Sequence, residues 1–188
     1  MKKLKLQMQM TINGYVAGLD GKNEWMTWNP DAEFTEFLIS LLDTSDTLLL
    51  GRKTAESIIK YWENEADQNP AHPFAKKIAA LPKVVFTKTL NKSTWNNTTL
   101  AKGNLIEEIA DLKKQGGKDM LVFGGAEFVS SLIKEGLIDE YHLIINPTAM
   151  GNGMTIFSSL DRIQKFTPIQ SKLYSGGKTI LSFKPKND

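Results

Sequence analysis

The sequence predicts an α/β fold of three layers, in which a mainly parallel central sheet carries helices on both faces and an antiparallel hairpin at its C-terminal edge. Short apolar runs, typical of strands buried on both faces, alternate along the chain with segments whose apolar residues recur at helical spacing. Two alternating runs flank Gly176-Gly177, a strong hairpin signal. No repeat or long linker divides the sequence, so we expect one domain over residues 1–188.

The N-terminal half should supply two strands and two helices. Apolar and polar residues alternate over residues 4–10, as in a half-buried strand, and the glycine-rich residues 13–25 indicate a long loop. In residues 28–43, Asn29 is a good N-cap, Pro30 suits the first helical position, and the apolar residues form one helical stripe. The other predicted elements here are a buried strand over 47–51 and a short helix over 54–62.

The C-terminal half continues the alternation. The polar residues 64–73 indicate a loop, and residues 104–117 form an amphipathic helix closed by a glycine pair that suits a left-handed C-cap. A strand over 140–150 is interrupted late by Pro147. The remaining predicted elements are a helix over 74–81, a strand over 83–87, a strand within 119–125, a helix over 126–135, and hairpin strands over 171–175 and 178–183.

Composition and charge exclude several classes of protein. The net charge of +2 at pH 7 is too balanced for a nucleic-acid-binding surface. Cysteine is absent, which excludes disulfides and thiolate sites, and His142 reads as a core residue, so we expect no metal centre. No apolar run approaches ~18 residues, and the basic N-terminus lacks the apolar stretch of a signal peptide. We therefore expect a cytoplasmic protein with no membrane or nucleic-acid partner.

Two predicted strands end in residues that suit an anionic ligand. Ligands of open α/β sheets bind beyond the C-terminal ends of the strands, where helix N-termini offer free N–H groups to phosphates. The residues concerned are Gly51, Arg52, Lys53 and Thr54 at one end, and Thr87 and Lys88 at the other. A Thr-Lys pair suits a ribose 2′-phosphate, whereas an acidic residue would suit a free 2′-hydroxyl. Each end alone could be an ordinary basic helix start or turn, but together they indicate an elongated ligand with separated phosphates.

A third strand end carries the glycine pair Gly124-Gly125, directly before a helix that starts with Ala126 and Glu127. Glycine would let a pyrophosphate approach the backbone beside the helix N-terminus. The alternative is that the pair only allows a tight turn from strand to helix. The sequence contains neither a dinucleotide-binding fingerprint nor a Walker loop, so both interpretations stay open.

These strand ends resemble the dihydrofolate reductase-like superfamily in order and spacing. "LLLGRKTAESI" (48–58) is similar to that family's segment over the cofactor phosphates. "VVFTK" (84–88) matches the strand whose end holds the adenosine 2′-phosphate, and "LVFGGAEF" (121–128) the paired-glycine turn at the pyrophosphate. The resemblance implies NADPH as the cofactor and hydride transfer to a small heterocyclic or carbonyl substrate.

Two further segments point to one branch of that superfamily. "NGYVA" (13–17) and "GNGMTIF" (151–157) resemble motifs of the reductase domain in bifunctional riboflavin-biosynthesis proteins. The first lies in a segment similar to the flexible loop that closes over the nicotinamide, which implies cofactor contacts by Val16 and Ala17. The resemblance thus implies activity like that of 5-amino-6-(5-phosphoribosylamino)uracil reductase.

Reduction also needs a proton source, which the resemblance places at the start of the helix over 28–43. True dihydrofolate reductases commonly show a tryptophan, a carboxylate five residues later and a phenylalanine four beyond that. Trp28, Glu33 and Phe37 reproduce this spacing. Glu33 is therefore the first candidate for a catalytic acid and Asp31 the second, with Trp28 and Phe37 beside the substrate. Both acids could instead only complement the helix dipole.

The substrate stays open at this stage. Riboflavin-pathway reductases often carry an acidic residue directly before the paired glycines, where this chain has Phe123. The alternatives are a true dihydrofolate reductase, favoured by the Trp28–Glu33–Phe37 spacing, and a nucleotide-binding module that has lost catalysis.

The resemblance also implies a homodimer formed through the C-terminal part of the sheet. A proline inside a strand, such as Pro147, belongs at an edge or bulge, and apolar edge strands invite pairing with a partner. Five apolar residues could line the interface or pack within one subunit: Tyr141, Leu143, Ile145, Leu173 and Ile180.

Overall fold

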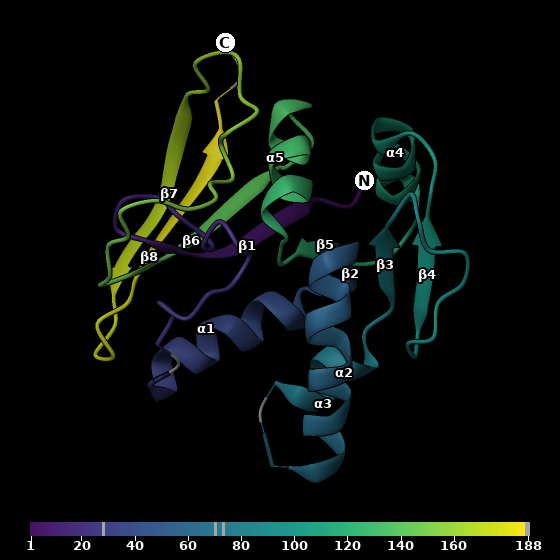
Figure 1. The fold of residues 1–188 in the computed structure, drawn as a ribbon, viewed down its shortest axis with the longest axis horizontal. Coiled ribbons are helices and arrows are strands. Elements are labelled where there is room, and N and C mark those ends of the chain that lie inside the picture. Colours follow the sequence, from purple (N-terminus) through teal and green to yellow (C-terminus); the bar gives the residue numbers. More distant parts are fainter. Residues whose placement is uncertain (28, 70, 73, 187–188) are drawn as a thin grey trace.

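The computed structural model describes residues 1–27, 29–69, 71–72 and 74–186. The strands in these ranges are β1 (Leu4–Thr11), β2 (Ser45–Gly51), β3 (Lys83–Phe86), β4 (Thr98–Ala101), β5 (Asp119–Val122), β6 (Glu140–Asn146), β7 (Phe166–Leu173) and β8 (Thr179–Pro185). They form one sheet in the order β4-β3-β2-β5-β1-β6-β8-β7 (Figure 1). Neighbours from β4 to β6 run parallel, whereas β8 is antiparallel to β6 and β7. The predicted mainly parallel sheet with a C-terminal hairpin is confirmed.

Helices cover both faces of this sheet, which confirms the three layers. They are α1 (Ala32–Asp43), α2 (Arg52–Gln68), α3 (Ala75–Ala80), α4 (Leu105–Lys114) and α5 (Ala126–Lys134). In Figure 1, α1, α2 and α3 lie below the sheet and α4 and α5 above it. Strand β2 shows why a continuous apolar run was needed: Leu49 packs into the core under α4 and α5, whereas Leu48 and Leu50 pack into the core on the α1 side.

Several predicted boundaries were wrong for local reasons. Helix α2 continues to Gln68, through half of the predicted loop, because polar residues can extend an exposed helix. Helix α1 begins at Ala32, with Asp31 rather than Asn29 as its N-cap: the Asp31 carboxylate accepts a hydrogen bond from the Phe34 N–H at 2.7 Å. Strand β4, with sequence TTLA, was not predicted at all.

Two predictions about glycine and proline also fail in detail. Helix α4 ends at Lys114, its C-cap Gln115 has an extended backbone, and positive φ occurs only two residues after Gln115, at Gly117. Strand β6 ends at Asn146, so Pro147 follows the strand instead of interrupting it. Because β6 lies between β1 and β8, the argument that Pro147 marks an edge strand was wrong.

The edge strand on this side of the sheet is β7. Three of the apolar residues that could have formed a dimer interface, Tyr141, Leu143 and Ile180, are buried within the subunit. Leu173 of β7 is 71% exposed and therefore remains available to a partner. His142 is buried as predicted, and its Nδ1 lies 2.8 Å from the Ser182 hydroxyl oxygen.

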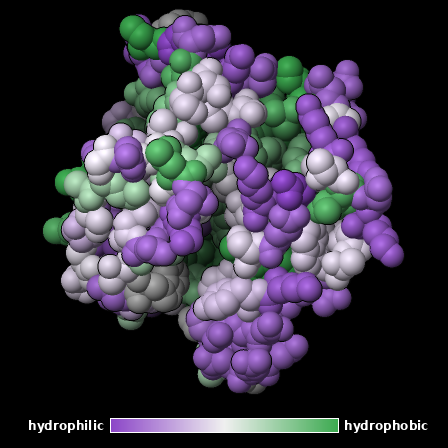
Figure 2. All heavy atoms as spheres, in the orientation of Figure 1, coloured by the Kyte–Doolittle hydropathy of each residue, from purple (hydrophilic) through white to green (hydrophobic). Residues whose placement is uncertain are grey.

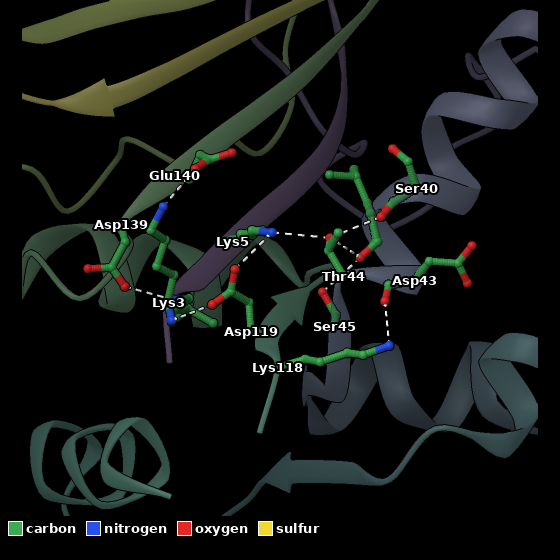
Figure 3. A network of polar contacts seen from close by, with 12 residues as sticks. Lys3, Lys5, Ser40, Asp43, Thr44, Ser45, Lys118, Asp119, Asp139 and Glu140 are labelled. Carbon is green, nitrogen blue, oxygen red and sulfur yellow. Dashed lines mark hydrogen bonds and ion pairs between the residues drawn. The ribbon is translucent and has the colours of Figure 1, made fainter. Parts of the chain in front are cut away.

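Polar contacts tie the amino ends of the central strands together (Figure 3). Lys5 is buried, and its Nζ lies 2.9 Å from the Asp119 carboxylate and donates to the Thr44 hydroxyl at 3.2 Å. Burial opposes ionisation of Asp119, but the Lys3 N–H and the Lys5 ammonium outweigh it and lower the pKa of this carboxyl. This network pairs the buried Lys5 ammonium with a carboxylate and links the ends of β1, β5 and α1.

Candidate active site

A cavity of about 1150 Å³ opens at the carboxyl ends of the parallel strands. Its lining includes every residue that the sequence predicted to contact a cofactor, namely Val16, Ala17, Gly51, Arg52, Lys53, Thr54, Thr87, Lys88, Gly124, Gly125, Ala126 and Glu127. Figure 2 shows a hollow near the middle of this side of the molecule, with hydrophobic residues at its floor and hydrophilic residues around much of its rim. The three strand ends that lie far apart in sequence are thus brought to one site.

Two helices begin at this cavity with glycine as their N-cap. Gly51 precedes α2 and Gly125 precedes α5, and neither helix has a side-chain cap. The first N–H groups of both helices are therefore free to donate to a ligand, and each helix adds partial positive charge at its start. The Gly51 N–H donates to the Gly124 carbonyl at 3.2 Å, which joins the ends of β2 and β5 directly.

The structure also gives these glycines a packing role. Gly124 has φ +142°, a conformation that favours glycine, and a cis peptide bond joins it to Gly125. A Cβ on Gly125 would lie 2.6 Å from Thr54 Oγ1, and a Cβ on Gly51 would lie 2.9 Å from Phe128 Cβ. A valine at position 125 would therefore collide with Thr54 before it met any ligand. The tight-turn interpretation has direct structural support, and it does not exclude an anion beside the same helix.

Basic side chains surround the two helix N-termini. Arg52 donates through Nη1 to both carboxylate oxygens of Glu56, at 2.9 and 2.8 Å, and its other N–H groups have no partner among the described residues. Lys53 is exposed, with Nζ 3.8 Å from Glu127. Lys88 is exposed, and the described chain offers it no ion pair. All three cations can bind a phosphate. Arg52 and Lys53 would first have to leave their carboxylate partners, whereas Lys88 has none among the described residues.

The end of β3 is held in a defined turn. Thr87 is buried, and its hydroxyl oxygen accepts hydrogen bonds from the N–H groups of Thr89 and Leu90, both at 3.1 Å. Lys88, within this ST turn, is exposed and lines the cavity. Phe86, the last residue of β3, stacks on Phe128 of α5 with ring centroids 4.8 Å apart, so the second and third strand ends are packed against each other.

The two motifs that suggested the riboflavin branch lie side by side. The Val16 N–H donates to the Met154 carbonyl and the Met154 N–H to the Ala17 carbonyl, both at 2.8 Å. A Cβ on Gly153 would lie 2.5 Å from the Ala17 carbonyl oxygen, which explains the glycine at that position. Residues 151–157 therefore hold the loop after β1 against the cavity.

The predicted acids lie elsewhere. The Asp31 carboxylate caps α1 and accepts hydrogen bonds from the Ser175 hydroxyl at 2.7 Å and the Gly176 N–H at 2.9 Å. The Phe34 N–H, the Ser175 hydroxyl and the Gly176 N–H lower the pKa of Asp31 to about 2. Glu33 forms an ion pair with Lys172 of β7. Neither acid is part of the cavity lining, and this placement argues against the role of proton donor, which stays a prediction.

Phe37, which the sequence placed beside the substrate, is not among the described lining residues either. Phe37 packs edge-on against His142, with ring centroids 5.7 Å apart, and also contacts Tyr174. Trp28 lies outside the described residues. The cavity wall on the α1 side is instead apolar and includes Leu38, Leu41 and Phe74, together with two carboxamides of β1, Gln7 and Gln9.

Sequence reasoning missed these two carboxamides. Strand β1 was taken as half-buried, but β5 and β6 flank it and helices cover both faces. A polar residue on a central parallel strand is unusual, because such strands are buried on both sides. Gln7 and Gln9 could have been found from that signal if the central position of β1 had been known.

The sequence matches the RibD C-terminal domain over residues 2–179. The chain belongs to this family. Among curated relatives, it is 30% identical to the uncharacterized protein YyaP of Bacillus subtilis (strain 168) over 176 residues, which cover 94% of this chain and 91% of YyaP. It is 24% identical to the riboflavin biosynthesis protein RibD of Corynebacterium ammoniagenes, covering 81% of this chain and 45% of that protein.

Solved structures agree on the fold. A putative riboflavin biosynthesis protein from Shewanella sp. PV-4 superimposes with a TM-score of 0.75 at 24% identity and full coverage of both chains. The diaminohydroxyphosphoribosylaminopyrimidine deaminase/5-amino-6-(5-phosphoribosylamino)uracil reductase of Thermotoga maritima gives 0.70 at 16% identity, covering 98% of this chain and 57% of that one. The predicted resemblance to riboflavin-type reductases with a dihydrofolate-reductase-like fold is confirmed.

Two further observations concern membrane spans and metal sites. Within the described ranges, no helix is long and apolar enough to cross a membrane. Nowhere in the same ranges do three or more His, Asp or Glu side chains come together as a metal site would require.

Proposed function

We propose that this chain is an NADPH-dependent reductase that transfers a hydride to a small heterocyclic or carbonyl substrate. The observation that carries the proposal is the convergence of two uncapped helix N-termini and three basic side chains, Arg52, Lys53 and Lys88, on one large cavity. This donor set suits a ligand with several separated phosphates. Membership of a reductase-related family supports the same reading.

The residues present fit such a cofactor in a definite order. The first turns of α2 and α5 would bind the pyrophosphate, and Lys88 would pair with the 2′-phosphate that distinguishes NADPH from NADH. Val16 and Ala17, held by Met154, would position the loop after β1 over the nicotinamide. When bound, NADPH supplies the hydride, which is added to the carbon of a C=O or C=N group while the oxygen or nitrogen takes up a proton.

A second candidate is a nucleotide-binding module without catalysis. The observation that favours it is the absence of Glu33 and Asp31 from the described cavity lining, whose carboxylates, Asp20, Glu24 and Glu127, come from the loop before α1 and the first turn of α5. A reductase could still obtain its proton from water, so this absence does not outweigh the site as a whole. A true dihydrofolate reductase gains no support, because Glu33 and Phe37 face the C-terminal hairpin and His142 instead.

Titration calorimetry with NADPH and NADH, followed by an assay of NADPH oxidation with pteridines, pyrimidines and flavin precursors, tests the proposal. We expect NADPH to bind and at least one class of compound to be reduced. Failure of NADPH to bind would contradict the proposal. Binding without oxidation across the whole panel would favour the module that only binds.

A further inference from the structure

The α1 side of the cavity combines apolar walls with a polar strip on β1. Gln9 pairs with Ile144 in the parallel ladder between β1 and β6, so the two side chains share one face of the sheet. Ile144 belongs to the core under α1, and the adjoining cavity wall includes Leu38, Leu41 and Phe74 from the same core. Charged residues of the described lining come instead from the loop after Gly18, the first turns of α2 and α5, and the end of β3.

The orientation of the Asn146 carboxamide is fixed by backbone groups. Asn146 is 1% exposed, and its Nδ2 donates to the carbonyl oxygens of Met10 at 3.4 Å and Ile144 at 3.3 Å. A carbonyl oxygen can only accept, so the amide nitrogen must face this pair. Oδ1 has no partner among the described residues, and exchanging the two ends of the carboxamide would in addition set it against two carbonyl oxygens inside the protein.

Asn146 in turn fixes Gln9. Nδ2 of Asn146 also donates to Gln9 Oε1, at 2.9 Å, so its two hydrogens are shared among three acceptors, and Gln9 must present its oxygen to Asn146. The Gln9 Nε2 group is then left as a donor. Gln9 lines the cavity, is only half-buried, and has no acceptor for Nε2 among the described residues. The chain of contacts therefore orients a hydrogen-bond donor on the cavity floor before any ligand binds.

We propose that Gln9, positioned by Asn146, donates a hydrogen bond from Nε2 to a carbonyl oxygen of the substrate, and that this substrate is a neutral carbonyl compound without a phosphate. The inference rests on the proposed function and names its substrate class. A phosphate against Leu38, Leu41 and Phe74 would lose its hydration on apolar walls, because the cations of the described lining lie on other elements. A ring carbonyl offers the acceptor that Gln9 lacks, and the rest of a flat ring would contact the apolar side chains.

The test uses full-length protein saturated with NADP⁺ and compares neutral probes (uracil, uridine and the fused-ring dione lumazine) with uridine 5′-monophosphate by ligand-observed NMR. Uridine and its monophosphate share the same ring carbonyls and differ by one phosphate. We expect at least one neutral probe to bind at millimolar concentration and the monophosphate to bind more weakly than uridine.

The variant Gln9→Glu keeps an acceptor for Asn146 and removes the donor. It should weaken the neutral probe about tenfold without changing NADP⁺ affinity.

Gln7→Glu is the matched control, because it adds the same charge to the same face of β1 without an Asn146 contact. We expect it to have a clearly smaller effect. The positioning role of Asn146 is tested by the variant Asn146→Ala in the wild-type protein and in the Gln9→Ala variant. Asn146 can orient the Gln9 carboxamide only where that carboxamide is present. Asn146→Ala should weaken the neutral probe in the first background alone, whereas a merely structural role would weaken it in both.

The outcomes separate the two proposals. If NADP⁺ binds but no neutral probe does, or if the monophosphate binds better than uridine, the substrate class is wrong and the reductase proposal stands. Equal losses in Gln9→Glu and Gln7→Glu would overturn the oriented donor. If neither NADP⁺ nor NADPH binds, the proposed function fails first, and neutral probes that still bind the free protein through Gln9 would preserve the oriented donor alone.

Discussion

A Cβ atom on Gly125 would lie 2.6 Å from the hydroxyl oxygen of Thr54, so the N-cap of α5 is in tight contact with the first turn of α2. The next Thr54 atom, its Cβ, would be 3.9 Å away, which is an ordinary contact. The conflict is therefore confined to one oxygen atom. This closeness sets the distance between the two helix N-termini that face the cavity, and it links the shape of the site to the stability of the fold.

The variant Gly125→Ala should lower the free energy of unfolding by about 1–3 kcal/mol, as overpacking does in well-packed sites. Thr54→Ala removes the offending oxygen, so the double variant Gly125→Ala/Thr54→Ala should recover most of that loss. Urea unfolding of the two single variants and the double variant measures the coupling. Additive effects in the cycle would show that Thr54 moves aside without cost.

Lys88 should contribute specifically to NADPH affinity. It is exposed beside the cavity and has no ion pair among the described residues, so it can meet a 2′-phosphate directly. We expect Lys88→Met to weaken NADPH about 10- to 100-fold, the range of one charge-assisted contact, and to leave NADH unchanged. Lys92→Met, which removes the same charge from an exposed position outside the cavity lining, is the control. A parallel loss of NADH affinity would place Lys88 at another part of the cofactor.

Glu33 offers a test of the proton source. Loss of a general acid typically lowers turnover by about 10²–10⁴-fold. Because Glu33 pairs with Lys172 and does not line the cavity, we expect Glu33→Gln to change kcat much less than that, once a substrate is in hand. A loss of the full size in kcat, with unchanged NADPH affinity, would restore Glu33 to the catalytic role that its spacing from Trp28 and Phe37 suggested.

The residues proposed to bind the cofactor could be predicted from the sequence, whereas Gln9, proposed to contact the substrate, could not. Gly51-Arg52 and Thr87-Lys88 can be recognised in the sequence because glycine, basic and hydroxyl residues directly follow apolar strands. In a parallel sheet, the carboxyl end of each strand is the end that faces the site. Gln9 depends on a contact with Asn146, 137 residues away. No local pattern encodes such a pairing, because it depends on which strands become neighbours.

Asp31 illustrates a different limit. The sequence suggested both a catalytic acid and a residue that complements the helix dipole, and local spacing could not decide between them. What the sequence could not show is the hairpin turn, where Ser175 and Gly176 donate to the same carboxylate that caps α1. Strand β4 was missed for a related reason: its four residues form a strand only because β3 offers an open edge beside them.

Asp31 should make stability depend on acid pH. Its pKa in the folded protein is about 2, below the ordinary value of 3.8, because the ionised form accepts hydrogen bonds from Phe34, Ser175 and Gly176. The depressed pKa contributes stability that is fully present above about pH 4 and is lost as the pH falls toward 2.

The variant Asp31→Asn should therefore flatten the pH dependence between pH 4 and 2 and, as a weakened cap, lower the melting temperature at neutral pH by about 2–4 °C. Asp67→Asn, at an exposed position near the end of α2, serves as the control. Melting curves measured across this pH range decide the matter. An unchanged pH dependence in Asp31→Asn would show that the hairpin contacts do not favour the ionised form.

Strand β7 leads to a last prediction, that the chain forms a homodimer. It is the outer strand of the sheet on the hairpin side, and it leaves one row of backbone groups unpaired by any other strand of the described chain. Ile169 and Leu173 expose 46% and 71% of their surface there.

Light scattering at micromolar concentration should give twice the 21.0 kDa of one chain. The double variant Ile169→Lys/Leu173→Lys should shift the mass to one chain without loss of secondary structure, because both side chains lie on the surface. A wild-type protein that keeps the mass of one chain across the micromolar range would exclude the dimer. A variant that stays dimeric would move the interface away from β7.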